Sequence, residues 1–214
     1  MLDTRLPSND RDHALRTGHV AIRWSPVTDA VAAVADAYAA LWGPPSRTAE
    51  FHSGALEVEI QKWAADANPE GVALYATLGS SRYPVPGWDS SHRLEFILGL
   101  LPERDEVASS LAALALYSQR EGEALDHGHT VTAEGPLWSG TTMDGFLVMR
   151  PASPLVRIIN FDGMHIEVLQ AIPTYKTERD LLREKPADEL LADWQQEGVP
   201  FWDPQRPPHD RGQQ

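Results

Sequence analysis

The sequence predicts an α+β fold, in which a mixed, largely antiparallel sheet is covered by helices packed mainly on one face. Two observations lead to this class. Strand-like segments follow one another through short loops, and a long helical segment is inserted among them. Another helical segment precedes all of the strands. A sheet with helices packed against it accounts for this order of elements.

The first element is a helix that begins at Ser25, a residue suited to the N-cap, with Pro26 in its first turn. Gly43 and the two prolines that follow it end the helix. Its apolar stripe is expected to consist of Val27, Val31, Val34, Tyr38 and Leu41.

Strands are expected next. Residues 55–63 alternate between apolar and polar side chains, as in a strand with one solvent-exposed face. Glu57 and Glu59 lie on that polar face. Residues 72–78 are more uniformly apolar and fit an inner strand. Residues 92–101 then form a third strand with one strongly apolar face.

Pro102 opens a second helix, which is expected to end near Gly122 and carries acidic residues near its positive end. The further strands are expected at residues 129–134, 144–149, 155–161 and 165–172. Asp162–Met164 links the last two as a tight hairpin, because Asp and Gly tolerate the positive φ that such turns require. Helices are expected at residues 175–185 and 186–194.

Length and composition bound the domain organisation. With 214 residues, of which 42% are hydrophobic, the chain is long enough to bury one substantial core. We expect a loosely ordered segment at residues 1–24, a single domain at 25–198 and a Pro-rich C-terminal tail at 199–214.

The balance of charged residues excludes some classes of function. The formal net charge is −13, from 18 basic and 31 acidic residues, and no cationic cluster is present, so nucleic-acid binding is not expected. The acidity is explained either by solubility or by a surface that steers a basic protein partner. No apolar run approaches the roughly 20 residues that span a bilayer, so we expect a soluble cytoplasmic protein. Cysteine is absent, which excludes disulfides and thiolate metal sites, and no cofactor is expected.

The stretch "LGSSRYP" places two serines, Ser80 and Ser81, directly after an apolar segment. A hydrolase nucleophile elbow reads G-x-S-x-G, but Tyr83 stands where the second glycine is required. No lysine follows a glycine, as a phosphate loop would require. We interpret the stretch as a turn that ends a strand.

The segment "DHGH" brings Asp126, His127 and His129 within four positions, a set that can chelate a metal from a loop. No H-E-x-x-H motif accompanies it, and we interpret it as an exposed turn. A metal-dependent or serine hydrolase that uses this segment, or the adjacent serines, is the alternative function. Glu95, which interrupts an apolar strand next to Arg93, is interpreted as a partnered structural carboxylate.

Tyr83 and Trp88 lie in the turn-rich segment "SSRYPVPGWDSSH", where few residues can be buried. Exposed aromatic residues beside acids are typical of interface hot spots. Together with Asp89, Glu57 and Glu59, they are the candidate partner-binding residues. A loop folded over its own aromatic side chains is the alternative interpretation.

Five segments occur in an order and spacing that resemble the Suppressor of fused domain. They are "LYATLGSSRYP", "HRLEFILGLL", "LAALALYSQREGEALDHGHTV", "PLWSGTTMDGFLV" and "VLQAIPTYKTERDLL". The resemblance covers roughly Trp42 to Gln195, and implies the fold of the N-terminal domain of that family.

The resemblance implies a non-enzymatic protein-binding domain. Animal members have a second domain and add a transcription-factor peptide to a sheet edge. Bacterial single-domain members resemble immunity proteins of polymorphic toxin systems. We therefore expect a bacterial immunity protein that binds and neutralises a cognate toxin, with a basic toxin domain as its partner. A structural subunit of a larger assembly is a third possibility, and the sequence leaves the oligomeric state open.

Overall fold

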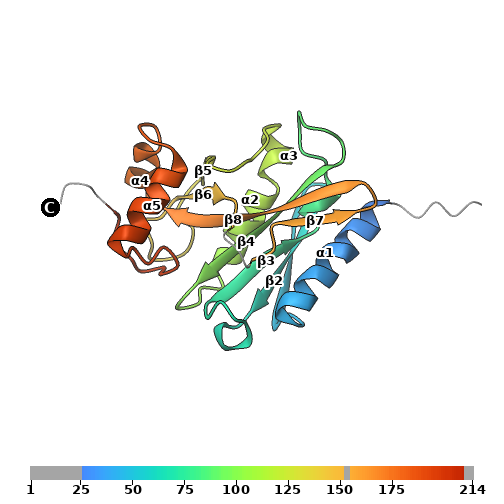
Figure 1. Ribbon diagram of the computed structural model, residues 1–214, viewed down its shortest axis with the longest axis horizontal. Coiled ribbons are helices and arrows are strands. Elements are labelled where there is room, and N and C mark those ends of the chain that lie inside the picture. Colours follow the sequence, from blue (N-terminus) through green and yellow to red (C-terminus); the bar gives the residue numbers. More distant parts are fainter. Residues whose placement is uncertain (1–25, 152–154, 210–214) are drawn as a thin grey trace, which may run out of the picture.

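The computed structural model describes residues 26–151 and 155–209 (Figure 1). The segment expected to be loosely ordered, 1–24, lies outside these residues, as do Ser25 and the side chain of Val27. The helices are α1 (Pro26–Trp42), α2 (Val107–Ala115), α3 (Tyr117–Glu121), α4 (Lys176–Leu181) and α5 (Ala187–Glu197). The strands are β1 (Arg47–Ser53), β2 (Leu56–Trp63), β3 (Ala73–Leu78), β4 (His92–Leu100), β5 (Thr130–Thr132), β6 (Gly145–Met149), β7 (Ile158–Phe161) and β8 (Met164–Thr174).

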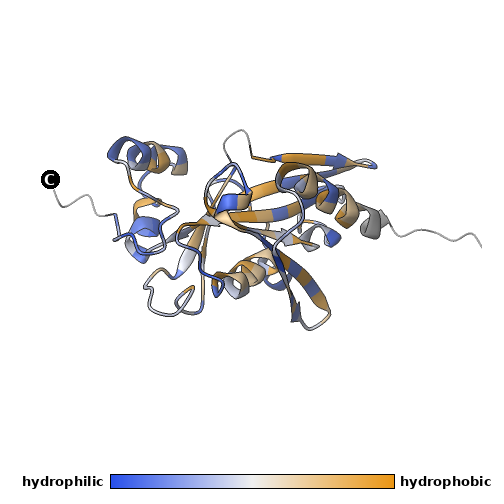
Figure 2. Ribbon diagram, turned by 90° about the horizontal axis from the view of Figure 1, so that it is seen from below, coloured by the Kyte–Doolittle hydropathy of each residue, from blue (hydrophilic) through white to orange (hydrophobic). Residues whose placement is uncertain are grey.

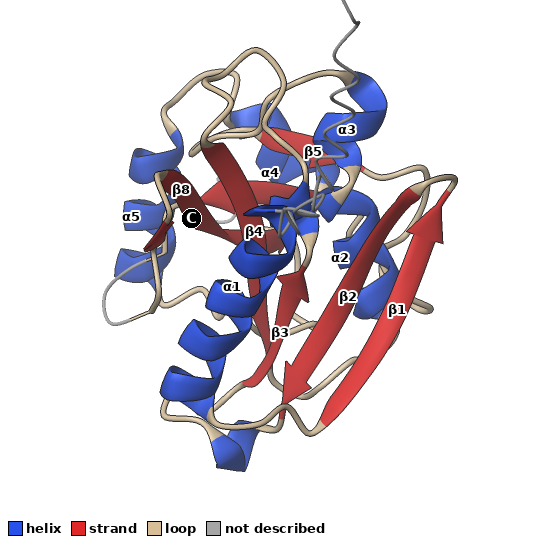
Figure 3. Ribbon diagram, turned by 90° about the vertical axis from the view of Figure 1, so that its right-hand side faces the viewer, coloured by secondary structure: helices blue, strands red, loops and turns tan. Residues whose placement is uncertain are grey.

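The strands of the described residues form one sheet in the order β1-β2-β3-β4-β8-β6-β5, and β7 pairs with β8 outside this path. β4 and β8 run parallel, with His92 opposite His165, and the other pairs are antiparallel. The α+β class and the mixed, largely antiparallel sheet are therefore confirmed. Figure 3 shows β1 at the outer edge of the sheet, next to β2.

The helices cover both faces of the sheet, which differs from the expectation that they pack mainly on one. α1 buries Val34 and Tyr38 against one face, and α2 buries Val107 and Leu111 against the other (Figure 3). α5 covers a third cluster around Leu147, Ile172 and Trp194. The inner strands β3, β4 and β8 are apolar on both faces, so each face needs a cover.

The buried stripe of α1 shares Val34 and Tyr38 with the expected stripe, but includes Ala30 and Trp42 in place of Val31 and Leu41. The side chains of Ala30, Val34, Tyr38 and Trp42 are buried, whereas Leu41 is exposed. Trp42 packs on Tyr38 and on Trp63 of β2, with ring centroids 5.3 and 5.1 Å apart. The four buried residues follow one another at intervals of four, which keeps them on one side of a helix.

Two further elements differ from the sequence prediction. β1 was not predicted, because "RTAEFHS" has hardly any apolar residues. Its pairing with β2, the packing of Phe51 and an ion pair between Arg47 and Asp105 fix it to the domain. The helix expected between Pro102 and Gly122 is divided into α2 and α3 at Leu116. Gly122, with φ of 74°, ends α3 as expected.

Residues 199–209, expected to form part of a Pro-rich tail, pack on the domain. Arg206 is 2% exposed and forms a bidentate ion pair with Glu178 of α4, in which Nη2 donates to Oε2 over 2.8 Å. The guanidinium lies 5.3 Å from the ring centroid of Tyr175 and 5.1 Å from that of Trp194. The backbone N–H of Leu101 donates to the Trp202 carbonyl over 2.9 Å, so the segment also contacts the end of β4.

Apolar residues are concentrated along the strands in the middle of the molecule, while the C-terminal helices α4 and α5 carry mainly hydrophilic residues (Figure 2). Within the described part of the chain, no helix combines the length and the apolar character needed to cross a membrane.

Candidate partner-binding surface

The turn that contains Ser80 and Ser81 has a structural role. After β3 the chain turns at Gly79, whose φ is 109°, and the backbone N–H groups of Gly79 and Ser81 donate to the carboxylate of Glu95 over 2.9 and 3.0 Å. The Thr77 hydroxyl is a third donor to the same carboxylate. Glycine is required at position 79 because other residues rarely adopt this φ.

Glu95 is thus a partnered structural carboxylate, as expected, but its partners lie in this turn rather than at Arg93. It is fully buried, and burial raises its pKa against the opposing effect of the donors from Thr77, Ser81 and Gly79. Ser81 is also fully buried, and the Ser80 hydroxyl donates to the Ala115 carbonyl over 3.0 Å. Neither serine is placed to meet a substrate.

The "DHGH" segment is held in a hydrogen-bonded network. Arg150 donates to Asp126 and to Glu167, each over 2.7 Å. The Nδ1 atom of His127 accepts from the Arg150 backbone over 3.0 Å, and its Nε2 lies 3.1 Å from Asp188.

His129 accepts from the Asp126 backbone through Nδ1, over 3.2 Å. Both imidazoles are therefore engaged in holding the turn. In the described ranges, no group of three or more His, Cys, Asp or Glu side chains is arranged to hold a metal ion. Within residues 26–151 and 155–209, neither the two serines nor the "DHGH" segment forms the site that the hydrolase alternative would need.

Glu57 and Glu59 lie on an acidic face that also includes two residues of β1. Glu50 stands directly opposite Glu59 in the β1–β2 register, and His52 stands opposite Glu57. We call these four residues the acidic β1–β2 face. Sequence reasoning missed Glu50 and His52 because it missed β1. The available signal was a hairpin, in which Gly54, with φ of 62°, lies in the short turn between two strands.

Two contacts fix the acidic β1–β2 face to the turn after β3. Arg82 donates to the Glu57 carboxylate over 2.7 Å, and the Glu57 backbone donates to the Tyr83 hydroxyl over 2.9 Å. Glu59 accepts from the side chain of Gln61 over 2.8 Å. Of the five candidate residues, the structure therefore brings Tyr83 together with Glu57 on the strand that also carries Glu59.

Trp88 and Asp89 form a separate group in the loop before β4. Trp88 is half-buried, and its ring meets the His92 ring edge-on with centroids 4.7 Å apart. Asp89 is exposed, and hydrogen bonds from the Ser91 hydroxyl and backbone lower the pKa of its carboxyl group. Tyr83 and Trp88 both pack against the main apolar cluster, so the loop is partly folded over its own aromatic side chains.

Both the sequence and the fold of this chain are similar to those of known proteins. A family model described as Suppressor of fused protein (SUFU) matches residues 54–207. No match was found among curated proteins.

Three solved structures share the fold. A SUFU homologue from Neisseria gonorrhoeae has a TM-score of 0.65 and 18% identity, with 85% of this chain and 97% of that chain covered. A chain of the Sufu–Fu complex has a TM-score of 0.61 and 13% identity, with 85% and 91% covered. Drosophila Suppressor of Fused has a TM-score of 0.61 and 14% identity. The match covers 85% of this chain but only 50% of the Drosophila chain.

Proposed function

This chain belongs to the Suppressor of fused family, and we propose that it is a non-enzymatic domain that binds a basic protein partner. In the narrower form of the proposal, the chain is a bacterial immunity protein in the cytoplasm that binds and neutralises a cognate toxin domain. The family supports the broader form, since a structural relative was solved as the Sufu–Fu complex.

The observation that carries the choice of surface is the pairing of Glu50 with Glu59. Like charges directly opposite each other on neighbouring strands destabilise a sheet, so this pair has a cost to the fold. A cationic partner would relieve that repulsion. The guanidinium of Arg82, which lies next to this face, is already paired with Glu57.

The position of β1 supports the same surface. β1 pairs only with β2 among the described strands, so one side of its backbone has no strand partner. Edges of this kind accept an added strand from another protein through main-chain hydrogen bonds. A partner strand at this edge would lie beside Glu50 and His52, next to the acidic β1–β2 face. Tyr83 would then be a neighbouring contact, while Trp88 and Asp89 would extend the interface along the loop before β4.

The test of the immunity role uses the product of the gene adjacent to the one that encodes this chain. Both proteins are co-expressed, and growth is compared with cells that express the neighbouring product alone. We expect a co-purifying complex and restored growth. If no complex forms and growth is not restored, the immunity role is wrong. A complex without protection would leave the broader binding function in place.

A further inference from the structure

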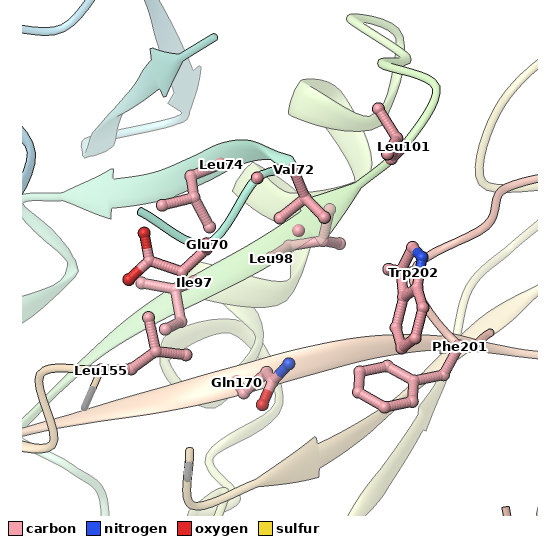
Figure 4. A pocket seen from close by; sticks show the side chains of 12 residues that line it. Glu70, Val72, Leu74, Ile97, Leu98, Leu101, Leu155, Gln170, Phe201 and Trp202 are labelled. Carbon is pink, nitrogen blue, oxygen red and sulfur yellow. The ribbon is translucent and has the colours of Figure 1, made fainter. Parts of the chain in front are cut away.

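A pocket of about 360 Å³ lies between the sheet and the C-terminal segment, and shares no residue with the acidic β1–β2 face (Figure 4). Its walls are mainly apolar and include the side chains of Leu74, Ile97, Leu101, Leu155, Phe201 and Trp202. Leu101 is 45% exposed and Trp202 is 41% exposed, which makes them two of four large apolar side chains exposed in the described part of the chain. Exposed apolar surface gathered at a concavity is typical of binding sites.

Gly99 of β4 keeps this pocket open. A Cβ atom at this position would lie 2.8 Å from Cγ2 of Val72, a separation that real Cβ atoms essentially never show. A larger side chain at position 99 would therefore displace Val72 or fill the space.

Glu70 adds a carboxylate to these apolar walls. Its Oε2 atom is buried and has no hydrogen-bond partner in the described structure. Figure 4 shows this carboxylate near Leu155 and Ile97 at one end of the pocket. A buried acceptor without a donor costs free energy, so such an atom indicates a missing partner.

The turn before β3 holds Glu70 in place. The Asn68 side chain donates to the carbonyls of Ala64 and Val72, over 2.6 and 2.9 Å, and accepts from the Glu70 backbone over 3.1 Å. The carboxylate is thus supported by a turn cross-linked on both sides, and little ordering would be needed when a ligand arrives.

The polar groups of the pocket define the chemistry of its ligand. Besides Glu70, the pocket is lined by Gln170, whose amide makes no hydrogen bond to another described residue. An unpartnered carboxylate oxygen at the end of apolar walls suits a ligand with an apolar stem and a cationic, hydrogen-donating head. A lysine side chain has this form, with four methylene groups and an ammonium that only donates.

We propose that this pocket, the Glu70 pocket, receives a lysine side chain of a protein partner together with an apolar side chain next to it. The ammonium binds the Glu70 carboxylate, the stem lies along Ile97 and Leu155, and the neighbouring apolar side chain contacts Trp202. The formal net charge of −13 favours a cationic occupant. This inference rests on the proposed protein-binding function and adds a second contact to it.

The experiment measures binding of short capped peptides to the full chain by NMR. The probes are acetyl-Leu-Lys-Leu-amide, the same peptide with norleucine in place of lysine, and hexylamine as a free amine. Norleucine keeps an apolar stem and removes the ammonium. Glu70→Gln removes the charge at nearly constant size, and Glu184→Gln is the matched control, since Glu184 is exposed and its side chain has no described partner. Thermal unfolding establishes that both variants fold.

We expect the lysine peptide to shift the Gly71 and Gly99 amide signals and the Trp202 indole signal. We also expect it to bind about tenfold more tightly than the norleucine peptide, a preference that Glu70→Gln abolishes and Glu184→Gln keeps. Absence of shifts at millimolar peptide, equal binding of both peptides, or equal behaviour of the two variants would overturn the proposal. Binding of hexylamine as tightly as the lysine peptide would also overturn it, in favour of a small-molecule site. Continued binding of a cognate partner after such a result would leave the proposed function intact.

Discussion

At the scale of single residues, the buried carboxylate of Glu95 organises the turn after β3. Three donors from one short segment converge on it, two of them backbone N–H groups. Burial without a paired cation makes the charged form costly, which is why burial is the largest influence on its pKa. The stretch around Ser80 and Ser81 is therefore shaped to bind an internal carboxylate.

The raised pKa of Glu95 predicts a pH dependence. Below the ordinary pKa of 4.5, this carboxyl is protonated in both the folded and unfolded chain. As the pH rises, the unfolded chain loses this proton first, so the folded state loses stability until the pH passes the folded pKa. We expect the free energy of unfolding of the wild type, relative to Glu95→Gln, to fall by up to about 1.4 kcal/mol per pH unit above 4.5.

Urea unfolding between pH 4 and 8 measures this difference. Glu184→Gln, which replaces an exposed glutamate, serves as the matched control variant. A flat or rising difference for Glu95→Gln would contradict the raised pKa.

The sequence could predict that Glu95 has a partner, because a carboxylate inside an apolar strand must be compensated. It could not identify the partner, since backbone N–H groups in a turn carry no side-chain signature. In the same way, Glu57 and Glu59 were readable as one polar face. The position of Glu50 next to them follows from the pairing of β1 with β2, which the sequence pattern does not show.

At the scale of elements, β4 lies at the centre of the sheet between β3 and β8. Leu94 is buried on the face covered by α2, within the largest apolar cluster. We predict that Leu94→Ala lowers the free energy of unfolding by about 2–5 kcal/mol, because the cavity adds to the lost burial. Urea denaturation measures the change. A loss well below 1 kcal/mol would place β4 at the periphery of the core.

The C-terminal segment is held by an ion pair with no exposed side-chain surface. Removing one member leaves a buried charge without its partner, so we expect Arg206→Ala to cost about 3–5 kcal/mol. The double variant Arg206→Met with Glu178→Gln removes both charges and should cost less than the single variant. Urea denaturation of the single and the double variant gives both values. Equal losses in the single and double variants would show that the pair is not the cause.

The elements divide into those with a local signal and those without one. α1 and strands β2, β3, β4, β6 and β8 have clear periodicity or apolar runs and were predicted close to their observed ranges. β1 lacks such a signal because it is an exposed edge strand defined by its partner. The packing of residues 199–209 depends on Glu178 and Trp194, which are distant in sequence from a segment rich in proline. The inner strands are apolar on both faces, so each face needs a cover of helices. The prediction nevertheless placed the helices mainly on one face.

At the scale of the whole molecule, the acidic surface has opposite effects on stability and association. Glu59→Lys replaces the repulsion with Glu50 by an attraction, so we expect the fold to be unchanged or stabilised by a few tenths of a kcal/mol, up to about 1. Thermal unfolding at low and high salt measures this gain, which should shrink as salt screens the charges. A clear destabilisation would mean that the contact of Glu59 with Gln61 matters more than the like-charge pair.

We propose that the acidic β1–β2 face binds a basic protein partner. The most direct test is the association rate of the identified partner with wild type, Glu59→Lys and the control Glu184→Lys, measured by stopped flow at low and high salt. Both variants change the net charge from −13 to −11, since one glutamate becomes one lysine. We expect Glu59→Lys to slow association by about tenfold at low salt and the control by much less, with the difference vanishing near 1 M salt. Equal rates for the two variants at low salt would show that the partner does not bind at this face.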